Sequence, residues 1–415
     1  MGTAGGDRAP GAVFVNQMGR TGLVGPLASW ITIAGWAGAA RQRYGAAWMV
    51  TTEGVLDPAE ALTRATAPVR AAAEVTGWRR RVPQVVRTAR NDLRRPRDNR
   101  HFLDGITTAP WRDHDVRFVM QLHGLACDAG LRLAADLRCP SVLVVDAVIV
   151  EEARSWGTHR PGWSHLALRF AERPALRAAD LVVCVSEEVV DSVRRHTGRT
   201  ADVVAIPNGV DTDHFTPGPA DAALRASLGV DGGFVVGWAG SFRRFHGLET
   251  LVDAVALLSR DVPDVRLLLL GDGFQRAAVE ERARTRGVTL VLPGTVPYSR
   301  VPAHLRCMDV AVVLGDPGRS FHYSPVKLRE YQACGLPVVA AAAGEMGRDL
   351  ASGAGARLVE AGDAPALAAA LRGLHDDPGA ARALGAAGRA AVEQGGSWTS
   401  RLVEVERLLG LGPPR

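Results

Sequence analysis

The feature that most constrains this sequence is a rhythm present in both halves of its 415 residues: a short apolar run, a turn, then a longer helical stretch. This alternation is typical of parallel sheets that are covered by helices. The strands expected in the first half are residues 12–17, 47–51, 116–122, 141–145, 181–185 and 203–206. Those expected in the second half are residues 234–238, 265–270, 289–292, 309–314 and 337–341. The pattern predicts an α/β protein made of two doubly wound, Rossmann-like domains.

The domain boundary is expected at a run of turn-forming residues, 207–211, which is followed by Pro217, Gly218 and Pro219. The chain exceeds the ~250–300 residues at which single cores stop growing, so two domains are expected. We predict an N-terminal domain over 1–206, a C-terminal domain over 207–395, and a closing amphipathic helix within 396–415 that packs back toward the first domain. Ligands of open parallel sheets bind beyond the carboxyl ends of the strands, so the site is predicted in the interdomain cleft.

Composition excludes several classes of protein. Hydrophobic residues make up 47% of the chain and charged residues 22%, which is typical of globular proteins and unlike disordered ones. The five cysteines show neither CxxC pairs nor His/Cys ligand spacing, which argues against a disulfide framework or a structural zinc site. Residues 21–40 carry no charge, but their glycines and Pro26 favour a loop and a buried helix over a membrane span. The apolar run 12–15 is too short for a signal peptide, so a cytoplasmic location is expected.

Positive charge is concentrated in one segment, residues 79–100, which holds nine arginines against Asp92 and Asp98. Aromatic residues for base stacking are not interleaved with these arginines, which argues against nucleic-acid binding. We therefore expect a peripheral contact with an anionic membrane at its inner face. The alternative is a solvated or partly disordered loop, which Pro83 and Pro96 favour.

Lys327 is the only lysine of the chain. The residues around it predict the start of a helix, with Ser324 as N-cap and Pro325 at the first helical position. Free backbone N–H groups beside an ammonium form a binding site for a diphosphate. Glu330 could then accept hydrogen bonds from sugar hydroxyls. An amphipathic helix with a solvated lysine and glutamate is the alternative.

A second basic group, Arg243 and Arg244, lies in a glycine-rich turn between a predicted strand and a helix. This geometry lets guanidinium groups approach phosphate oxygens, although two loop arginines are more often solvated. Residues 270–276 imitate a dinucleotide fingerprint, but Arg276 replaces its third glycine, which argues against a nicotinamide-dependent dehydrogenase.

Five stretches together resemble the retaining glycosyltransferases of family 4, which have the two-domain GT-B fold: residues 206–215, 240–247, 268–273, 293–296 and 327–340. The resemblance implies a nucleotide-sugar donor on the second domain and an acceptor on the first. It implies that Lys327, with Arg243 or Arg244, stabilises the charge growing on the diphosphate. It also implies that no metal or other cofactor is required, and that Glu330 binds the ribose.

The resemblance extends to backbone contacts with the donor. Ser324 and Val326 are expected at the diphosphate, and Gly294, Thr295 and Val296 beside the nucleobase. Gly22 falls in a glycine-containing loop after the first strand, which is expected under the donor phosphate.

The sequence departs from the family pattern at three positions. His322 lies where the first of two spaced glutamates is usual, His246 replaces a lysine before the glycine of the phosphate loop, and Asp146 replaces a strand-end histidine. His123 ends another strand and is expected to face the cleft, although such a histidine is as often structural.

The function predicted is transfer of a sugar from a nucleoside diphosphate to an acceptor hydroxyl with retention of configuration, in polysaccharide or glycoconjugate biosynthesis. The alternatives are a nucleotide-sugar epimerase or hydrolase of the same fold, and a non-catalytic protein that binds nucleotide-sugars. The residues do not name the sugar, the nucleoside or the acceptor.

Overall fold

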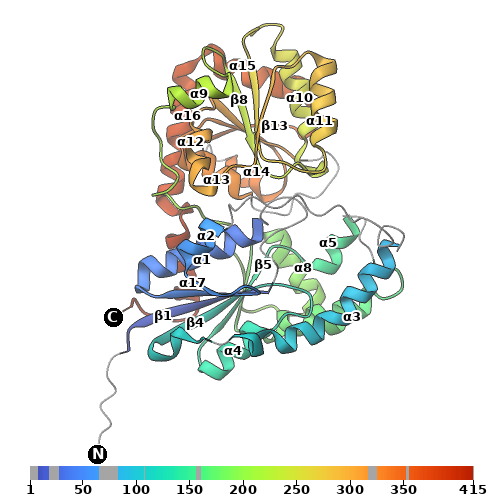
Figure 1. The fold of residues 1–415 in the computed structure, drawn as a ribbon, viewed down its shortest axis with the longest axis vertical. Coiled ribbons are helices and arrows are strands. Elements are labelled where there is room, and N and C mark those ends of the chain that lie inside the picture. Colours follow the sequence, from blue (N-terminus) through green and yellow to red (C-terminus); the bar gives the residue numbers. More distant parts are fainter. Residues whose placement is uncertain are drawn as a thin grey trace, which may run out of the picture.

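The computed structural model of this chain describes residues 8–17, 28–64, 83–106, 108–155, 160–315, 325–351 and 355–414. The described residues form two α/β domains, each built on a central sheet with helices around it (Figure 1). Gly22, Ser324 and His322 lie outside the described residues, so their predicted contacts with the donor stay predictions.

The first domain contains a seven-stranded sheet in the order β3-β2-β1-β4-β5-β6-β7, in which only β3 runs antiparallel to its neighbour. Its strands are β1 (Pro10–Asn16), β2 (Ala47–Thr51), β3 (Gly54–Leu56), β4 (Asp115–Leu122), β5 (Ser141–Val145), β6 (Leu181–Cys184) and β7 (Val203–Ala205). Its helices are α1 (Ala28–Tyr44), α2 (Pro58–Arg64), α3 (Gln84–Phe102), α4 (Ala129–Leu137), α5 (Ile149–Ser155), α6 (Ser164–Leu166), η4 (Ala167–Glu172), α7 (Arg173–Ala178) and α8 (Glu187–Thr197).

The second domain contains a six-stranded parallel sheet in the order β10-β9-β8-β11-β12-β13. Its strands are β8 (Val235–Ala239), β9 (Arg266–Leu270), β10 (Leu290–Gly294), β11 (Val310–Val313), β12 (Val338–Ala341) and β13 (Ala356–Val359). Its helices are α9 (Ala222–Leu228), η5 (Arg244–His246), α10 (Leu248–Leu258), α11 (Arg276–Arg286), η6 (Tyr298–Arg300), α12 (Val301–Leu305), α13 (Val326–Ala333), α14 (Gly344–Leu350), α15 (Ala364–Asp376) and α16 (Pro378–Ala391).

Strand order reverses between β1 and β4 in the first sheet and between β8 and β11 in the second. At such a reversal neighbouring connections leave toward opposite faces, which opens a crevice at the carboxyl ends of the strands. In the first domain this places His123, which follows β4, at the crevice. In the second domain, the reversal places the loop after β8 at the crevice.

Alternating side chains of each strand pack on opposite faces of the sheet. Ala12 and Phe14 join the core beneath α1, whereas Val13 and Val15 join a second cluster that includes Leu133 of α4. The four strand residues are fully buried, as expected for parallel strands covered on both faces.

The last helix, α17 (Trp398–Leu408), leaves the second domain and lies alongside α1 of the first (Figure 1). The side chain of Ser397 caps it by accepting a hydrogen bond from the Ser400 amide. Trp398 packs against Trp36 at a ring-centroid distance of 5.4 Å, and its indole covers Gly35 so closely that a Cβ there would lie 2.3 Å from it. Just before α17 begins, Ser397 forms a parallel β-bridge with Val210.

The arginine-rich segment is helical where it is described: α3 runs through Pro96 without interruption, so the loop alternative is wrong for residues 84–102. Asp92 on its inner side accepts two hydrogen bonds from Arg160, at 2.6 and 3.1 Å, and one from the Trp163 indole. These bonds fix the rotation of α3 about its own axis. Within the described ranges, no helix is both long and apolar enough to span a membrane.

Candidate functional site

Two glycine turns meet at the carboxyl ends of β8 and β9. Gly240 has φ 143° and donates its amide to the Leu270 carbonyl at 2.9 Å, while Gly271 has φ 130°. A Cβ on Gly271 would lie only 1.9 Å from the carbonyl oxygen of Gly240. Only glycine tolerates both this φ and this proximity, so the turns hold each other in place. The segment that imitates a dinucleotide fingerprint is therefore a tight strand-to-helix turn.

The Lys327 ammonium lies over the Trp238 ring, 3.8 Å from its centroid. Its Nζ is buried and has no hydrogen-bond partner among the described residues, and a Cβ on Gly240 would lie 2.7 Å from it. Burial lowers the pKa of Lys327 to about 7, against the opposing effect of Glu330. A buried cation that lies over an aromatic face is suited to an anionic ligand.

Helix α13 begins at Val326, so Pro325 occupies the N-cap position and makes no side-chain cap hydrogen bond. The predicted start, with Ser324 as N-cap and Pro325 in the first turn, is one residue too early. The Leu328 amide donates to the Pro325 carbonyl at 3.0 Å, so the amides of Val326 and Lys327 are the donors that the start of α13 can offer to a ligand beside Lys327.

Glu330 lies one turn further along α13 and is buried. Burial raises its pKa to about 7, while the Lys327 charge acts in the opposite direction. Tyr331 beside it accepts a hydrogen bond from the Ala239 amide at 2.7 Å, which ties α13 to the end of β8. The structure thus brings Glu330 and Lys327 together with the β8 loop, as predicted.

His246 lies beside Trp238, the residue that the Lys327 ammonium covers. Its ring contacts Trp238 edge-on at 5.3 Å. Burial lowers its pKa well below the usual value, and the charges of Lys327 and Arg243 act in the same direction. Arg243 therefore lies close to Lys327 and His246, and these three residues form what we call the Lys327 cluster. Arg244 starts η5 and is exposed.

The loop after β10 carries the three residues predicted beside the nucleobase. The Gly294 carbonyl accepts a hydrogen bond from the Gly271 amide at 2.8 Å, so this loop adjoins the two glycine turns. Thr295 is exposed, and Val296 packs partly into the domain core together with Tyr298.

His123 of the first domain is buried, and its backbone amide donates to Val144 of β5 at 2.7 Å. Its Nε2 lies 3.0 Å from Oε1 of Glu172, a fully buried residue at the end of η4. Its Nδ1 is buried and has no hydrogen-bond partner in the described part of the chain. Asp146, which follows β5, has its pKa raised to about 6 by burial and by Glu152, against the effect of His123.

Glu172 was not predicted from the sequence. It lies 49 residues from His123 in a stretch that contains no motif. A buried glutamate in an otherwise helical segment gives no local signal, because the partners that stabilise it come from other elements.

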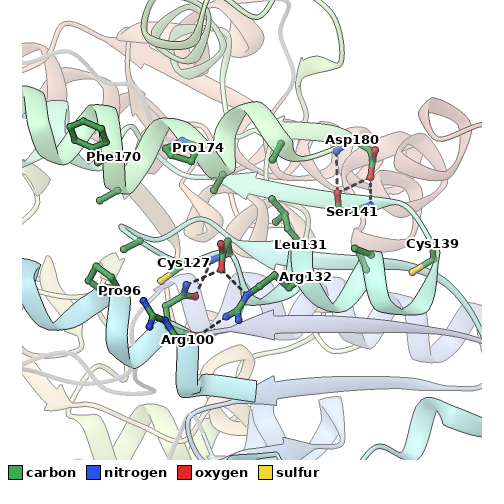
Figure 2. Close-up of a pocket in the computed structure, with 18 residues that line it drawn as sticks. Pro96, Arg100, Cys127, Leu131, Arg132, Cys139, Ser141, Phe170, Pro174 and Asp180 are labelled. Carbon is green, nitrogen blue, oxygen red and sulfur yellow. Dashed lines mark hydrogen bonds and ion pairs between the residues drawn. The ribbon is translucent and has the colours of Figure 1, made fainter. Parts of the chain in front are cut away.

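A separate groove of about 800 Å³ lies in the first domain between α3, α4 and the η4–α7 segment (Figure 2). Asn99 of α3 and Asp128 line it and are joined by two hydrogen bonds, at 2.8 and 3.0 Å. Arg132 of α4 donates to both residues. This network links α3 to α4, and the groove shares no residue with the Lys327 cluster.

Within the described residues, no group of three or more His, Cys, Asp or Glu side chains is arranged to hold a metal ion. The prediction that no metal is required stays a prediction.

Comparison with known families places this geometry in context. Residues 233–377 match the family described as Glycosyl transferases group 1, and residues 55–214 match Glycosyltransferase Family 4. A Mycolicibacterium smegmatis protein, GDP-mannose-dependent alpha-(1-6)-phosphatidylinositol monomannoside mannosyltransferase, is 31% identical over 258 residues. The match covers 60% of this chain and 68% of that relative. D-inositol 3-phosphate glycosyltransferase of Pseudarthrobacter chlorophenolicus is 37% identical over 211 residues, 48% of each chain.

Among solved structures, Anabaena HepE in complex with UDP and glucose superposes with a TM-score of 0.65 at 19% identity. The superposition covers 97% of this chain and 99% of HepE. Sucrose-phosphate synthase from Thermosynechococcus elongatus gives a TM-score of 0.61 at 21% identity, covering 97% and 98%. These likenesses confirm the predicted GT-B fold.

The two facing Rossmann-like domains define a GT-B protein. The chain belongs to the glycosyl transferases of group 1, family 4, and the predicted enzyme class, glycosyltransferase, is confirmed. The relatives support this class over the epimerase, hydrolase and non-catalytic alternatives.

Proposed function

We propose that this enzyme transfers a sugar from a nucleoside diphosphate to an acceptor hydroxyl with retention of anomeric configuration. The observation that carries the proposal is the buried Nζ of Lys327, which lies beside the Gly240 turn and the first amides of α13. A diphosphate bound there meets an ammonium and a helix N-terminus at once.

Each part of the cluster has a distinct task in this proposal. Lys327 and Arg243 stabilise the negative charge that grows on the leaving phosphate as the glycosidic bond breaks. Glu330 accepts hydrogen bonds from the ribose hydroxyls, and the Gly294–Val296 loop contacts the nucleobase. The new bond forms between the anomeric carbon and the acceptor oxygen, and the acceptor proton passes to the leaving phosphate. The fixed cations act where a metal ion would otherwise stabilise the diphosphate.

The names of similar proteins suggest which donors to test first. One relative is called GDP-mannose-dependent, and one GT-B structure was solved with UDP and glucose. GDP-mannose and UDP-glucose are therefore suitable first donors, and UDP and GDP suitable first ligands.

Thermal-shift measurements with UDP and GDP test the diphosphate site, because a ligand that binds only the folded state raises its melting temperature. We expect a shift in the wild-type chain that Lys327→Ala reduces by more than half at equal ligand concentration. Arg372→Ala is a matched control, since Arg372 is an exposed cation paired with Asp261. An undiminished shift in Lys327→Ala would refute the assignment.

The sequence also predicts a cytoplasmic protein that makes a peripheral contact with the inner membrane face. Helix α3 supports this prediction. Its inner stripe holds Thr88, Asp92, Arg95 and Asn99, all at least partly buried. Its outer face exposes five arginines together with apolar side chains: Arg87, Arg90, Arg94, Arg97, Arg100, Val86 and Leu93. Leu93 is 83% exposed and lies among these arginines. Exposed apolar side chains among arginines are typical of helices that bind anionic lipid.

Flotation with vesicles of anionic and of purely zwitterionic lipid tests this contact. We expect the wild-type chain to float with anionic vesicles only. A variant with Arg87, Arg90 and Arg94 changed to Gln should lose most of this binding while keeping its UDP-induced thermal shift. Equal flotation of both proteins would contradict the membrane proposal.

A further inference from the structure

His123 and Glu172 form a buried pair at the carboxyl end of β4. Their side chains are 1% and 0% exposed, and their closest polar atoms, Nε2 and Oε1, lie 3.0 Å apart. The chain just after His123 is tied to the same segment as Glu172, because the Ala126 amide donates to the Ala171 carbonyl at 2.6 Å. The orientation of the imidazole is thus fixed from its side chain and from its backbone.

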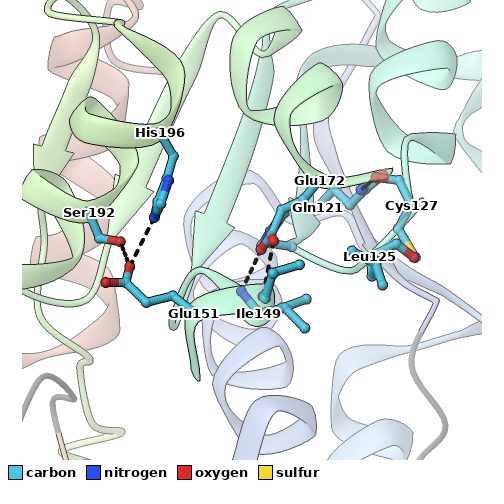
Figure 3. Close-up of polar contacts among 10 residues, drawn as sticks. Gln121, Leu125, Cys127, Ile149, Glu151, Glu172, Ser192 and His196 are labelled. Atoms are coloured by element: carbon cyan, nitrogen blue, oxygen red, sulfur yellow. Dashed lines mark hydrogen bonds and ion pairs between the residues drawn. The ribbon is translucent and has the colours of Figure 1, made fainter. Parts of the chain in front are cut away.

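The Glu172 carboxylate accepts hydrogen bonds from three donors. Besides His123, these are the backbone amides of Ile149 and Val150 in the first turn of α5, the latter at 3.1 Å. Figure 3 shows Glu172 facing Ile149 at this end of α5, while Glu151 of the same helix faces Ser192 and His196 instead. Two backbone amides already donate to this carboxylate, so it acts as an acceptor here, and Nε2 is the ring nitrogen placed to donate the third hydrogen bond.

This arrangement leaves Nδ1 as the remaining hydrogen-bonding atom of the ring. Nδ1 is buried and unpartnered within the described residues. Leaving a buried acceptor or donor unpaired is destabilising, so its retention calls for an explanation. Asp146 follows β5, and its pKa is raised to about 6 by burial and by Glu152 of α5, against the effect of His123. Both strand ends belong to the part of the sheet that borders the crevice.

We infer that Glu172 is a positioning residue for the transfer reaction: it holds His123 as the Nε2–H tautomer, so that Nδ1 accepts a hydrogen bond from a sugar hydroxyl in the cleft. The inference rests on the proposed function, because it assigns the sugar as the ligand of Nδ1. Glu172 acts only through His123 and does not touch the substrate.

Nitrogen-15 NMR of the histidine-labelled chain tests the tautomer without any need for activity, with His123→Ala used to assign the signal. We expect a protonated Nε2 and a bare Nδ1 in the wild-type protein. The opposite tautomer overturns the inference even if Glu172→Gln fails to fold, because this measurement uses the unaltered chain.

Kinetics with GDP-mannose and UDP-glucose test the role in the reaction. Glu172→Gln should lower kcat at least tenfold with donor KM changed less than threefold. In the His123→Ala background the same change should cause no further loss. Glu151→Gln removes a nearby carboxylate that does not contact His123, and should keep activity within twofold.

If the losses from Glu172→Gln and His123→Ala instead multiply, Glu172 has a purely structural role and the inference is wrong. If the wild-type chain consumes neither donor, the proposed function fails for these sugars. The sugar assignment for Nδ1 then falls with it, whereas the NMR result still decides whether Glu172 sets the tautomer. The two failures are therefore distinguishable.

Discussion

At the scale of single residues, the site depends on ionisable groups that the fold keeps away from water. Lys327 and Glu330 both have pKa values near 7, the first lowered and the second raised by burial. Near neutral pH each group therefore exists in both forms, and the negative charge of Glu330 favours the ammonium form of Lys327. A diphosphate bound as proposed would shift the lysine further toward its charged form.

This predicts a pH dependence of ligand binding. Lys327 carries its charge below its pKa of about 7 and loses it above, so the affinity for UDP should fall as pH rises. Between pH 7 and 8.5 we expect roughly a tenfold loss, measured by calorimetry. Lys327→Arg, charged throughout, should show a nearly flat profile. A flat profile in the wild-type protein would mean that Lys327 stays protonated.

The sequence singled out a site residue where one residue type carried the signal, and the role of that residue stays a prediction. Lys327 stood out because the chain contains no other lysine, and Glu330 follows it within one helical turn. Glu172 and the close approach of His246 to Trp238 were not predictable, because their partners lie in other elements and only the tertiary fold brings them together.

At the scale of elements, the strands were predicted to within two residues because a buried parallel strand is a continuous apolar run between turn residues. Two strands were missed. β3 has only three residues, and β13 is an edge strand interrupted by Arg357, so neither gives an apolar run. The helical course of α3 was also missed, since Pro96 suggested a break that the inward contacts of Asp92 and Asn99 prevent.

The paired glycine turns after β8 and β9 lead to a second prediction. Gly271→Ala should destabilise the protein by more than about 3 kcal/mol, because its Cβ would meet the Gly240 carbonyl and its backbone is strained for any other residue. Gly287→Ala is the control: its φ is also positive, at 70°, but nothing lies within 4 Å, so about 1–2 kcal/mol is expected. Urea denaturation measures both, and equal losses would contradict the steric argument.

At the scale of the whole molecule, α8 of the first domain and α14 of the second meet through an ion pair. Arg348 donates to Glu188 at 2.6 Å, and their side chains are 63% and 26% exposed. Such a pair is worth at most about 1 kcal/mol, so it biases the spacing of the domains without locking it.

A third prediction follows for domain closure. Arg348→Glu places two acidic groups opposite each other and should raise donor KM by about twofold to fivefold, because 0.5–1 kcal/mol is lost from the closed arrangement. The exchanged pair Glu188→Arg with Arg348→Glu should restore most of the wild-type value. Failure of the exchange to rescue would show that the contact does not influence closure. Small-angle scattering of the three proteins provides an independent measure of closure.

The course of α17 has a consequence for how the protein is made. The core of the first domain includes Trp398, Leu402 and Val405, which leave the ribosome after the entire second domain. The half of the molecule that is synthesised first therefore stays incomplete, with Trp36 lacking its partner, until translation reaches these last residues. A nascent chain stalled before residue 398 should accordingly expose apolar surface to chaperones, even though all seven strands of its first sheet have already been made.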